Sequence, residues 1–199
     1  MSDNFRFEAV REYRQKDIHG VCADLVPFTM EYAAEFVRMR NEERNKYFFN
    51  QQQDLTVESQ ERWYEKYLQR NNDIFWAILD KKGKFIGTTR LYDIASDGSI
   101  LEQGSFMIDE RISGTAPYAI EANIMCLDFA FDVLKVNEII NRDRNDNKVM
   151  NNLSRKFGFK FVRNVEINGV PYNYSLCDRE SYILVRGDIY ALVKYWAER

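Results

Sequence analysis

The chain has 199 residues, 45% of them hydrophobic and 15% aromatic, which suits one packed domain and is too short for two ordinary ones. Its 28 Lys and Arg residues against 31 Asp and Glu residues leave a net charge of −3, so there is no basic field to hold a phosphate backbone. We therefore expect no nucleic-acid partner.

The low histidine and cysteine content limits the kinds of catalytic and metal site that the chain can form. A Ser-His-Asp or Cys-His site would have to be built on the single histidine, His19. The cysteines Cys22, Cys126 and Cys177 form no C-x-x-C pair, which argues against structural zinc and against a disulfide framework. The first 25 residues lack the apolar core of a secretory signal, and no run approaches the roughly 18 apolar residues of a membrane span. We expect a cytoplasmic protein with no metal and no membrane partner.

The first part of the chain is predicted to contain a strand, two helices and a β-meander. Residues 22–27 favour a short strand, and Thr29 can cap a helix with apolar residues at helical spacing. After a polar break, a second amphipathic helix is predicted to begin at Thr56. The period of the apolar residues then becomes two, which is typical of antiparallel strands. These strands are expected at residues 74–79, 84–92 and 100–109.

The second part is predicted to begin with a long amphipathic helix that has Pro117 at its first position. Gly158 suits the left-handed cap that ends a later helix, and Asn168-Gly169 is a strong signal for a two-residue hairpin. Together these features predict a mixed α/β fold. The elements expected here are a helix at residues 117–134, a strand at 138–141, a helix at 147–157, strands at 159–167 and 170–177, and a helix at 188–198.

A possible anion site lies at residues 106–117, where a strand runs through a loop of small residues into a helix. Backbone N–H groups at such a helix start, together with the positive end of the helix dipole, stabilise an anion such as a pyrophosphate. A turn capped by Ser113 is the simpler interpretation of the same residues. Other motifs are needed to decide between the two.

Two motifs favour the anion site. Arg111-x-x-Gly114-x-Ala116 is similar to the [Gln/Arg]-x-x-Gly-x-[Gly/Ala] loop of the GCN5-related N-acetyltransferase (GNAT) superfamily, which holds the pyrophosphate of acetyl-coenzyme A (acetyl-CoA). Asn147, nine residues before Lys156, resembles the Asn-…-Lys-x-Gly-Phe end of the same coenzyme site. The resemblance therefore makes acetyl-CoA the expected co-substrate.

The resemblance covers residues 22–177 and implies the fold of that superfamily. This fold is a central, mostly antiparallel twisted sheet of about seven strands flanked by helices, here with an extra C-terminal helix. A single domain is expected at residues 21–199, after an N-terminal extension at residues 1–20. The cofactor-binding residues that the resemblance implies are Met107, Ile108, Arg111, Ile112, Ser113, Gly114, Thr115, Ala116, Asn147 and Asn152.

The sequence departs from the superfamily pattern at two places. The loop ends in Ala116-Pro117 rather than in glycine, which removes one N–H donor. Ser154 stands seven residues after Asn147, where many members have a tyrosine that protonates the departing thiolate, and a serine hydroxyl is far less acidic. Either another donor such as a water serves, or the solvent protonates the thiolate. A catalytically silent CoA-binding interaction module remains the alternative to an enzyme.

Glu102 is the candidate general base. Acetyl transfer to an amine needs a neutral nitrogen, a polarised thioester and an acceptor for the amine proton. Strand alternation places Glu102 on the same face as Gly104 and Phe106, and its position resembles the Glu of the superfamily's Glu-x-Gly motif. The alternative is a solvated carboxylate at the start of a strand.

Several segments resemble the amino-sugar-acetylating members of the branch that also holds ribosomal-protein N-terminal acetyltransferases. The substrate-binding residues implied are Arg40, Phe48, Phe49 and Tyr92, whose rings would suit a sugar or nucleotide face. The expected activity is direct transfer of an acetyl group to a primary amine of a small molecule, with an amino-sugar nucleotide as the leading acceptor. A protein N-terminus or a small amine such as an antibiotic is the alternative, and a monomer or homodimer is expected.

Overall fold

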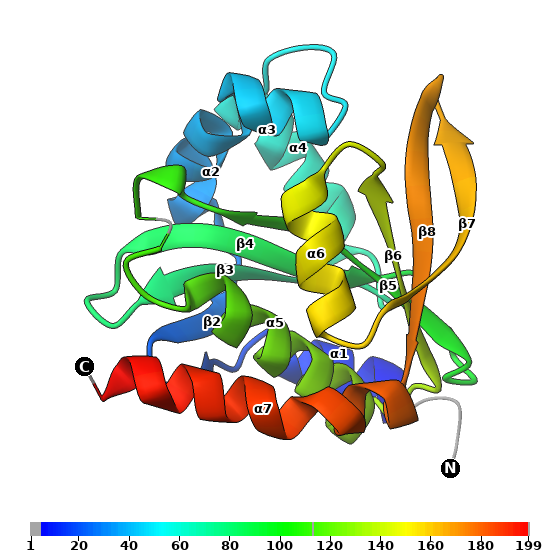
Figure 1. Cartoon of the computed structure of the whole chain (residues 1–199). Helices are drawn as coiled ribbons and strands as arrows, with labels where there is room; N and C mark the ends of the chain where they lie inside the picture. Colours follow the sequence, from blue (N-terminus) through cyan, green and yellow to red (C-terminus); the bar gives the residue numbers. More distant parts are fainter. Residues whose placement is uncertain (1–4, 113, 199) are drawn as a thin grey trace.

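A single eight-stranded sheet forms the centre of the computed structural model, which describes residues 5–112 and 114–198 (Figure 1). Its strand order is β1-β2-β3-β4-β5-β6-β8-β7, and every neighbouring pair is antiparallel except β5 and β6, which run parallel. This is the mostly antiparallel sheet that the family resemblance implies, with one strand more than the seven expected, because the short β1 was not predicted. The strands are β1 (Ile18–His19), β2 (Ala23–Pro27), β3 (Ile74–Asp80), β4 (Phe85–Tyr92), β5 (Ile100–Ile108), β6 (Glu138–Arg144), β7 (Lys160–Ile167) and β8 (Val170–Asp178).

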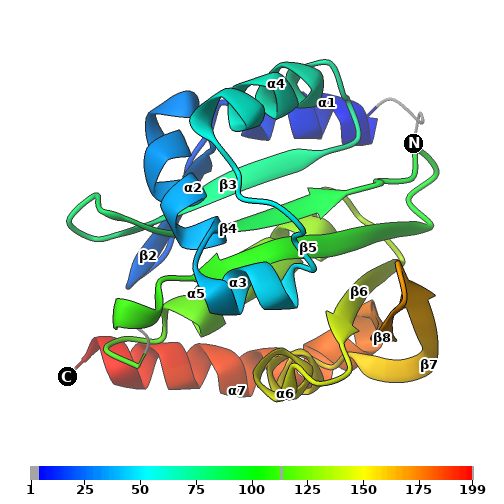
Figure 2. The same cartoon turned by 90° about the horizontal axis from the view of Figure 1, so that it is seen from above.

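Helices cover both faces of the sheet, and each face has its own apolar core (Figure 2). On one face α5 packs over β3 and β4 through side chains such as Trp76 and Leu91, and α7 lies against α5. On the other face α2 and α4 pack around Phe28 and Phe75. The helices are α1 (Phe5–Tyr13), α2 (Ala33–Arg40), α3 (Glu43–Phe48), α4 (Val57–Leu68), α5 (Tyr118–Asp128), α6 (Lys148–Lys156) and α7 (Arg179–Ala197).

The local signals in the sequence correctly place several element ends. The Thr56 hydroxyl accepts a hydrogen bond from the backbone N–H of Ser59 at 3.1 Å, and the Ser59 hydroxyl accepts one from the Thr56 N–H, so α4 begins with a capping box. Gly158 ends α6 with φ +86°, and a Cβ there would lie 2.7 Å from a backbone oxygen of α7. Asn168 and Gly169 both have positive φ, as a two-residue hairpin requires.

Other boundaries differ from the prediction. Pro117 is the cap residue before α5 rather than its first residue, and the helix ends at Asp128 in a π-helical turn, Phe129–Val133. The closing helix α7 begins at Arg179, where Asp178 caps it, and not at residue 188. Its first turns carry apolar residues on their exposed side, such as Leu184, which obscure the helical period in the sequence.

Two helices lie in segments where no element was predicted. In α1, Ala9 and Val10 are buried in the core cluster that also contains α5, and the Arg6 guanidinium donates to the backbone oxygen of Leu134 at 2.9 Å. The short α3 follows α2 directly and occupies the segment that the sequence suggests is a polar break. Within the described residues, no helix is both long and apolar enough to span a membrane.

Candidate active site

The two parallel strands β5 and β6 pair over only three residues. Pairing joins Ile100–Glu102 to Glu138–Ile140, and beyond it the strands diverge, as Figure 2 shows. In β5 a bulge at Ser105, which has φ 49°, adds one residue opposite β4 just after this point. The facing edges of β5 and β6 therefore lie open to a ligand, because neither strand pairs with the other there.

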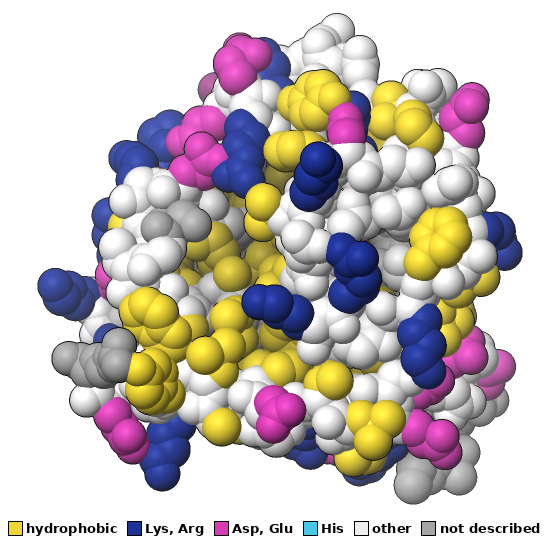
Figure 3. Space-filling model, viewed as in Figure 1, with side chains coloured by type: hydrophobic (Ala, Val, Ile, Leu, Met, Phe, Trp, Pro, Cys, Tyr) yellow, Lys and Arg dark blue, Asp and Glu magenta, His cyan; other side chains and the backbone are white. Residues whose placement is uncertain are grey.

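A cavity of about 340 Å³ occupies this divergence, and we call it the central cavity. Figure 3 shows the face as a hollow beside α6 lined by hydrophobic side chains, with Lys and Arg side chains around it. Seven of the predicted site residues line the cavity: Glu102, Met107, Ile108, Asn147, Phe48, Phe49 and Tyr92. Ser154, which stands where many members of the superfamily have a tyrosine, also lines the cavity. Polar wall residues that were not predicted are Arg44, Asn45, Gln103, Ser105, Asn123, Asn141, Arg142, Asp143, Arg144 and Tyr172.

Glu102 is buried in the cavity wall, with 4% of its surface exposed, so it is not a solvated carboxylate. Its oxygens accept hydrogen bonds from the Tyr92 hydroxyl and from both Nε and an Nη of Arg142, the Nε bond being 2.9 Å long. Burial raises the pKa of Tyr92, and the Glu102 charge raises it further, so the phenol stays protonated and donates. Glu102 is therefore held in one position by two partners from neighbouring strands.

Asp143 and Asn141 project from the opposite side of β6 from Arg142, because side chains alternate along a strand. The Ser154 hydroxyl of α6 donates to Asp143 Oδ2 at 2.9 Å and accepts from Asn141 Nδ2 at 2.7 Å. The central cavity therefore has a carboxyl group on each side of β6, and only the one at Glu102 has an arginine partner.

Asn147 and Asn152, both predicted to bind the cofactor, lie in different surroundings. Asn147 caps α6, where its Oδ1 accepts from the N–H of Met150 at 3.2 Å, and it is buried in the cavity wall. Its Nδ2 group bonds to none of the described residues, so this donor is free for a ligand carbonyl. Asn152 is exposed on α6, accepts a hydrogen bond from Arg155, and does not line the cavity.

The predicted anion loop leads out of the cavity from Ile108 towards α5. A single 3-10 turn, Glu110–Ile112, precedes Gly114, whose φ is +85°. The Thr115 N–H and hydroxyl both donate to the Ile112 oxygen, while Ser113 lies outside the described residues. Among the described residues no side chain caps the start of α5, whose cap residue is Pro117, so its first backbone N–H groups are available to an anion. Ala119 in that first turn lines the central cavity.

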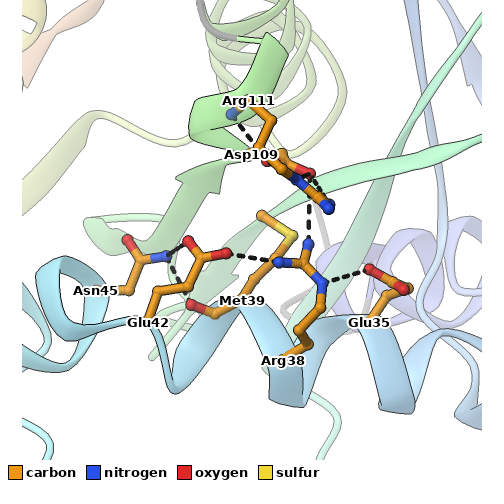
Figure 4. Close-up of polar contacts among 7 residues, drawn as sticks. All are labelled: Glu35, Arg38, Met39, Glu42, Asn45, Asp109 and Arg111. Carbon is orange, nitrogen blue, oxygen red and sulfur yellow. Dashed lines mark hydrogen bonds and ion pairs between the residues drawn. The ribbon is translucent and has the colours of Figure 1, made fainter.

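Arg111 is turned towards Asp109 at the end of β5 (Figure 4). Its Nε donates to Asp109 at 2.9 Å, and this hydrogen bond lowers the pKa of the nearly fully buried Asp109 carboxyl despite the burial. Arg38 of α2 donates to the same carboxylate at 3.3 Å and also bonds to Glu35 and Glu42. The loop is thus tied to α2 by a network that local sequence patterns do not reveal.

The helix α3 forms the end of the cavity away from α5. It places Phe48 in the wall, and Phe49 follows it directly. The Arg40 guanidinium lies 4.1 Å from the centre of the Phe49 ring, but Arg40 itself does not line the cavity. Burial lowers the pKa of Arg40 to about 10, and no described residue forms a hydrogen bond or an ion pair with it.

A contact joins α3 to the turn before α6 beside the cavity, which Arg144 lines. The Tyr47 hydroxyl donates to Asp146, and the Arg144 guanidinium lies 3.9 Å from the Tyr47 ring centre while donating to the Tyr47 backbone oxygen at 3.0 Å. Hydrogen bonds from Arg144 and then Tyr47 lower the pKa of the Asp146 carboxyl to about 2. Charged hydrogen bonds therefore connect α3 to the end of β6 and the turn before α6 at neutral pH.

A model of the acetyltransferase (GNAT) domain family matches residues 24–160, more than half of the chain. The chain belongs to the GNAT acetyltransferase family, which confirms the superfamily that its loop motifs predict. It is an acyltransferase, and GNAT acetyltransferases use acetyl-CoA as the acetyl donor. No curated protein sequence matches the chain. Among the described residues, no cluster of His, Cys, Asp and Glu side chains is arranged to hold a metal.

Solved structures share the fold at low sequence identity. A GCN5-related N-acetyltransferase from Brucella melitensis is 21% identical, with a TM-score of 0.76 over 90% of this chain and 86% of that one. A nucleotide-linked sugar GNAT, FdhC, is 18% identical, with a TM-score of 0.75 over 88% and 97%. Spermidine N-acetyltransferase from Vibrio cholerae, solved with CoA and spermine, is 16% identical, with a TM-score of 0.74 over 82% and 99%.

Proposed function

We propose that this acetyltransferase moves the acetyl group of acetyl-CoA directly to the primary amine of an amino-sugar nucleotide, and that both substrates meet in the central cavity. The observation that carries the location is the divergence of β5 and β6, which opens a strand edge beside the buried carboxylate of Glu102. In this proposal Glu102 accepts the amine proton, either directly or through a water.

The coenzyme is proposed to lie along the open edge of β5, past Met107 and Ile108, with its pyrophosphate at residues 111–116. The positive φ of Gly114 and the uncapped start of α5 provide backbone donors for an anion there. The free Nδ2 group of Asn147 offers a further donor on the other side of the cavity. Acetyl-CoA supplies the activated acetyl group, and these residues hold and orient it.

Arg40 favours an acceptor that carries negative charge. An arginine whose guanidinium is largely buried, with no carboxylate partner among the described residues, is unfavourable unless an anion joins it. Arg40 does not itself line the cavity but lies against the ring of Phe49, so the proposal places the charged group of the acceptor beyond that ring. Phe49, with Phe48 and Tyr92, gives the cavity an aromatic wall suited to a sugar or base. A polyamine would need ionised carboxylates without partners instead. Glu102 is already paired with Arg142, and burial raises the pKa of Asp143, which disfavours its charged form. The diphosphate of a nucleotide sugar matches these features better.

The first test replaces Arg40 with glutamine. Arg40→Gln is expected to raise the KM for an amino-sugar nucleotide about tenfold or more, because a hydrogen-bonded charge pair with the diphosphate is lost. The KM for acetyl-CoA and for the same amino sugar without its nucleotide should change little. Arg62→Gln, at an exposed position of α4, is the matched control. An equal rise in KM for the nucleotide and for the free amino sugar would contradict an anion-binding role for Arg40.

The second test asks whether the chain binds the coenzyme and turns over. CoA at a hundred times its dissociation constant should add about 2.7 kcal/mol to the free energy of unfolding. For a chain of this length we expect a rise in melting temperature of about 5–10 °C. Release of CoA thiol is then measured with acetyl-CoA and a panel of amines that includes amino-sugar nucleotides, polyamines and N-terminal peptides. Thermal protection without thiol release on any amine would instead indicate a silent CoA-binding module.

A further inference from the structure

Three polar side chains form a connected group on the α6 side of β6. Ser154 from α6 donates a hydrogen bond to Asp143 at 2.9 Å and accepts one from Asn141 at 2.7 Å. All three residues line the central cavity, and Ser154 and Asn141 are buried. The Oδ1 atom of Asn141 is buried without a hydrogen-bond partner, so this part of the wall is built to contact a polar ligand.

Asp143 lies in neutral surroundings. On β8 the residue opposite is Asn173, and on α6 the contacting group is the Ser154 hydroxyl. The arginines on either side in its own strand point to other carboxylates, Arg142 to Glu102 and Arg144 to Asp146.

Charged and titratable groups on the elements packed against β6 do not pair with Asp143. On α6 these groups are Lys148, Arg155 and Lys156, on β5 Glu102, and on β8 Tyr172, Tyr174, Cys177 and Asp178. No described residue forms an ion pair with Asp143. Burial raises the pKa of the Asp143 carboxyl, while the Ser154 hydrogen bond opposes the rise in part. Asp143 is thus a carboxyl group in the cavity wall whose surroundings favour the protonated form.

The two carboxyl groups of the cavity differ in the way an acid and a base should. Glu102 is fixed by an arginine and a tyrosine on one side of β6, whereas Asp143 has only neutral partners on the other. Two carboxyl groups in contrasting surroundings are a common basis for dividing acid and base roles within one site. The amine proton and the departing sulfur also need groups on different sides of the thioester.

We propose that Asp143, acting through the hydroxyl of Ser154, supplies the proton to the sulfur of the departing coenzyme A. This inference rests on the proposed acetyl transfer in the central cavity. It assigns the acid whose usual tyrosine is replaced by Ser154 in this chain.

The proton and electron movements of the step balance. The amine nitrogen forms a bond to the thioester carbon, the C–S bond breaks, and its electron pair stays on sulfur. In the free protein the Ser154 hydroxyl donates to Asp143, so in this step it turns to the sulfur and the protonated Asp143 donates to the Ser154 oxygen instead. The Ser154 hydroxyl proton then passes to the sulfur while the Asp143 proton passes to the Ser154 oxygen. Asn141 continues to donate to that oxygen and keeps the hydroxyl directed. The products are the amide and the CoA thiol, the amine proton leaves through Glu102 to solvent, and Asp143 regains a proton from solvent.

The test is Asp143→Asn, which keeps the shape of the side chain and can still accept a hydrogen bond from Ser154 but has no acidic proton. With an amine that the parent acetylates, kcat is expected to fall about ten- to a hundredfold. This loss is at or below the smallest usually seen when a general acid is removed, because a thiolate is a stable leaving group and needs less help from an acid. CoA affinity should stay within about twofold. Adding Ser154→Ala to this variant should cause little further loss, because the relay is already interrupted.

Two pH-dependent measurements separate this role from a purely structural one. The kcat of the parent should fall at high pH as Asp143 loses its proton, and the variant should lack that limb. The folded protein also holds the Asp143 proton more tightly than the unfolded chain, so parental stability should fall as pH rises above about 4. Asp143→Asn removes that loss, so the variant should melt higher than the parent at neutral pH. Asp188→Asn, on the exposed side of α7, should change neither property.

Each outcome decides the proposal. Reduced kcat with normal CoA binding, a lost high-pH limb and a higher melting temperature support the relay. A variant with parental kcat and an unchanged limb, or one that loses only CoA affinity, overturns the relay and leaves the acetyl transfer itself intact. A parent that binds CoA but releases thiol with no amine overturns both.

Discussion

Glu102→Gln is expected to lower kcat by about 10² to 10⁴ while leaving the affinity for CoA within about twofold. The substitution keeps the size of the side chain and can still accept from the Tyr92 hydroxyl, but it removes the proton acceptor. In both proteins the rate should rise with pH as more of the amine becomes neutral. The loss caused by the substitution should narrow along this rise, because a neutral amine needs less help from a base, until the fall assigned to Asp143 begins.

The ion pair with Arg142 requires a matched control, since Glu102→Gln also removes the partner of that guanidinium. Arg142→Gln breaks the same pair and retains the carboxylate. If proton transfer is what Glu102 provides, the arginine variant should keep most of the turnover. An equal loss in both variants would show that the ion pair, rather than the base, is needed. Parental turnover in Glu102→Gln near neutral pH would leave solvent or another carboxylate as the acceptor.

Gly114→Asp is expected to abolish measurable CoA binding, with an affinity loss of more than about a hundredfold, while the chain still folds. A Cβ at this position meets no atom within 4 Å, so the substitution fits sterically into the free protein. The new carboxylate would stand where the pyrophosphate is proposed to meet backbone N–H groups, and it would repel that anion. Circular dichroism should remain native-like, and the thermal protection by CoA should disappear.

The control is Gly83→Asp in the turn between β3 and β4. Gly83 also has positive φ, at +78°, and also meets no atom within 4 Å of an added Cβ. Both substitutions therefore carry a similar backbone cost, on the order of 1–2 kcal/mol. Only Gly114→Asp should lose CoA in a calorimetric titration. Equal CoA affinity in the two variants would place the pyrophosphate elsewhere.

Local chemistry explains what the sequence predicts well. The capping box at Thr56, the left-handed Gly158 and the Asn168-Gly169 turn each depend on a few adjacent residues, and the structure has all three. Strand alternation likewise indicates which face of β5 carries Glu102, although its burial and its arginine partner come from β6. The motif that includes Gly114 also belongs to one continuous loop.

The remainder depends on contacts between distant segments. In the first turns of α7, Tyr182 is buried against α5 whereas Leu184 is exposed. Apolar residues therefore occur on both sides of the helix there, and the sequence shows no clear helical period. Asp143 becomes notable only because α6 covers it with Ser154 and because its neighbouring arginines point elsewhere. Arg40 lacks a partner only in the folded chain. No single-sequence pattern contains that information.

The short parallel pairing of β5 and β6 divides the sheet into two parts, which we call leaves, and each leaf is built from one continuous stretch of the chain. Residues 18–108 build the larger leaf, residues 138–178 build the smaller one, and three residue pairs form the seam between them. Few backbone hydrogen bonds resist separation at such a seam, so local opening is expected to begin there rather than within either leaf. A ligand that contacts both leaves would close the seam. Coenzyme binding in this family member should therefore join two cooperative units into one, an effect that extends well beyond the atoms it touches.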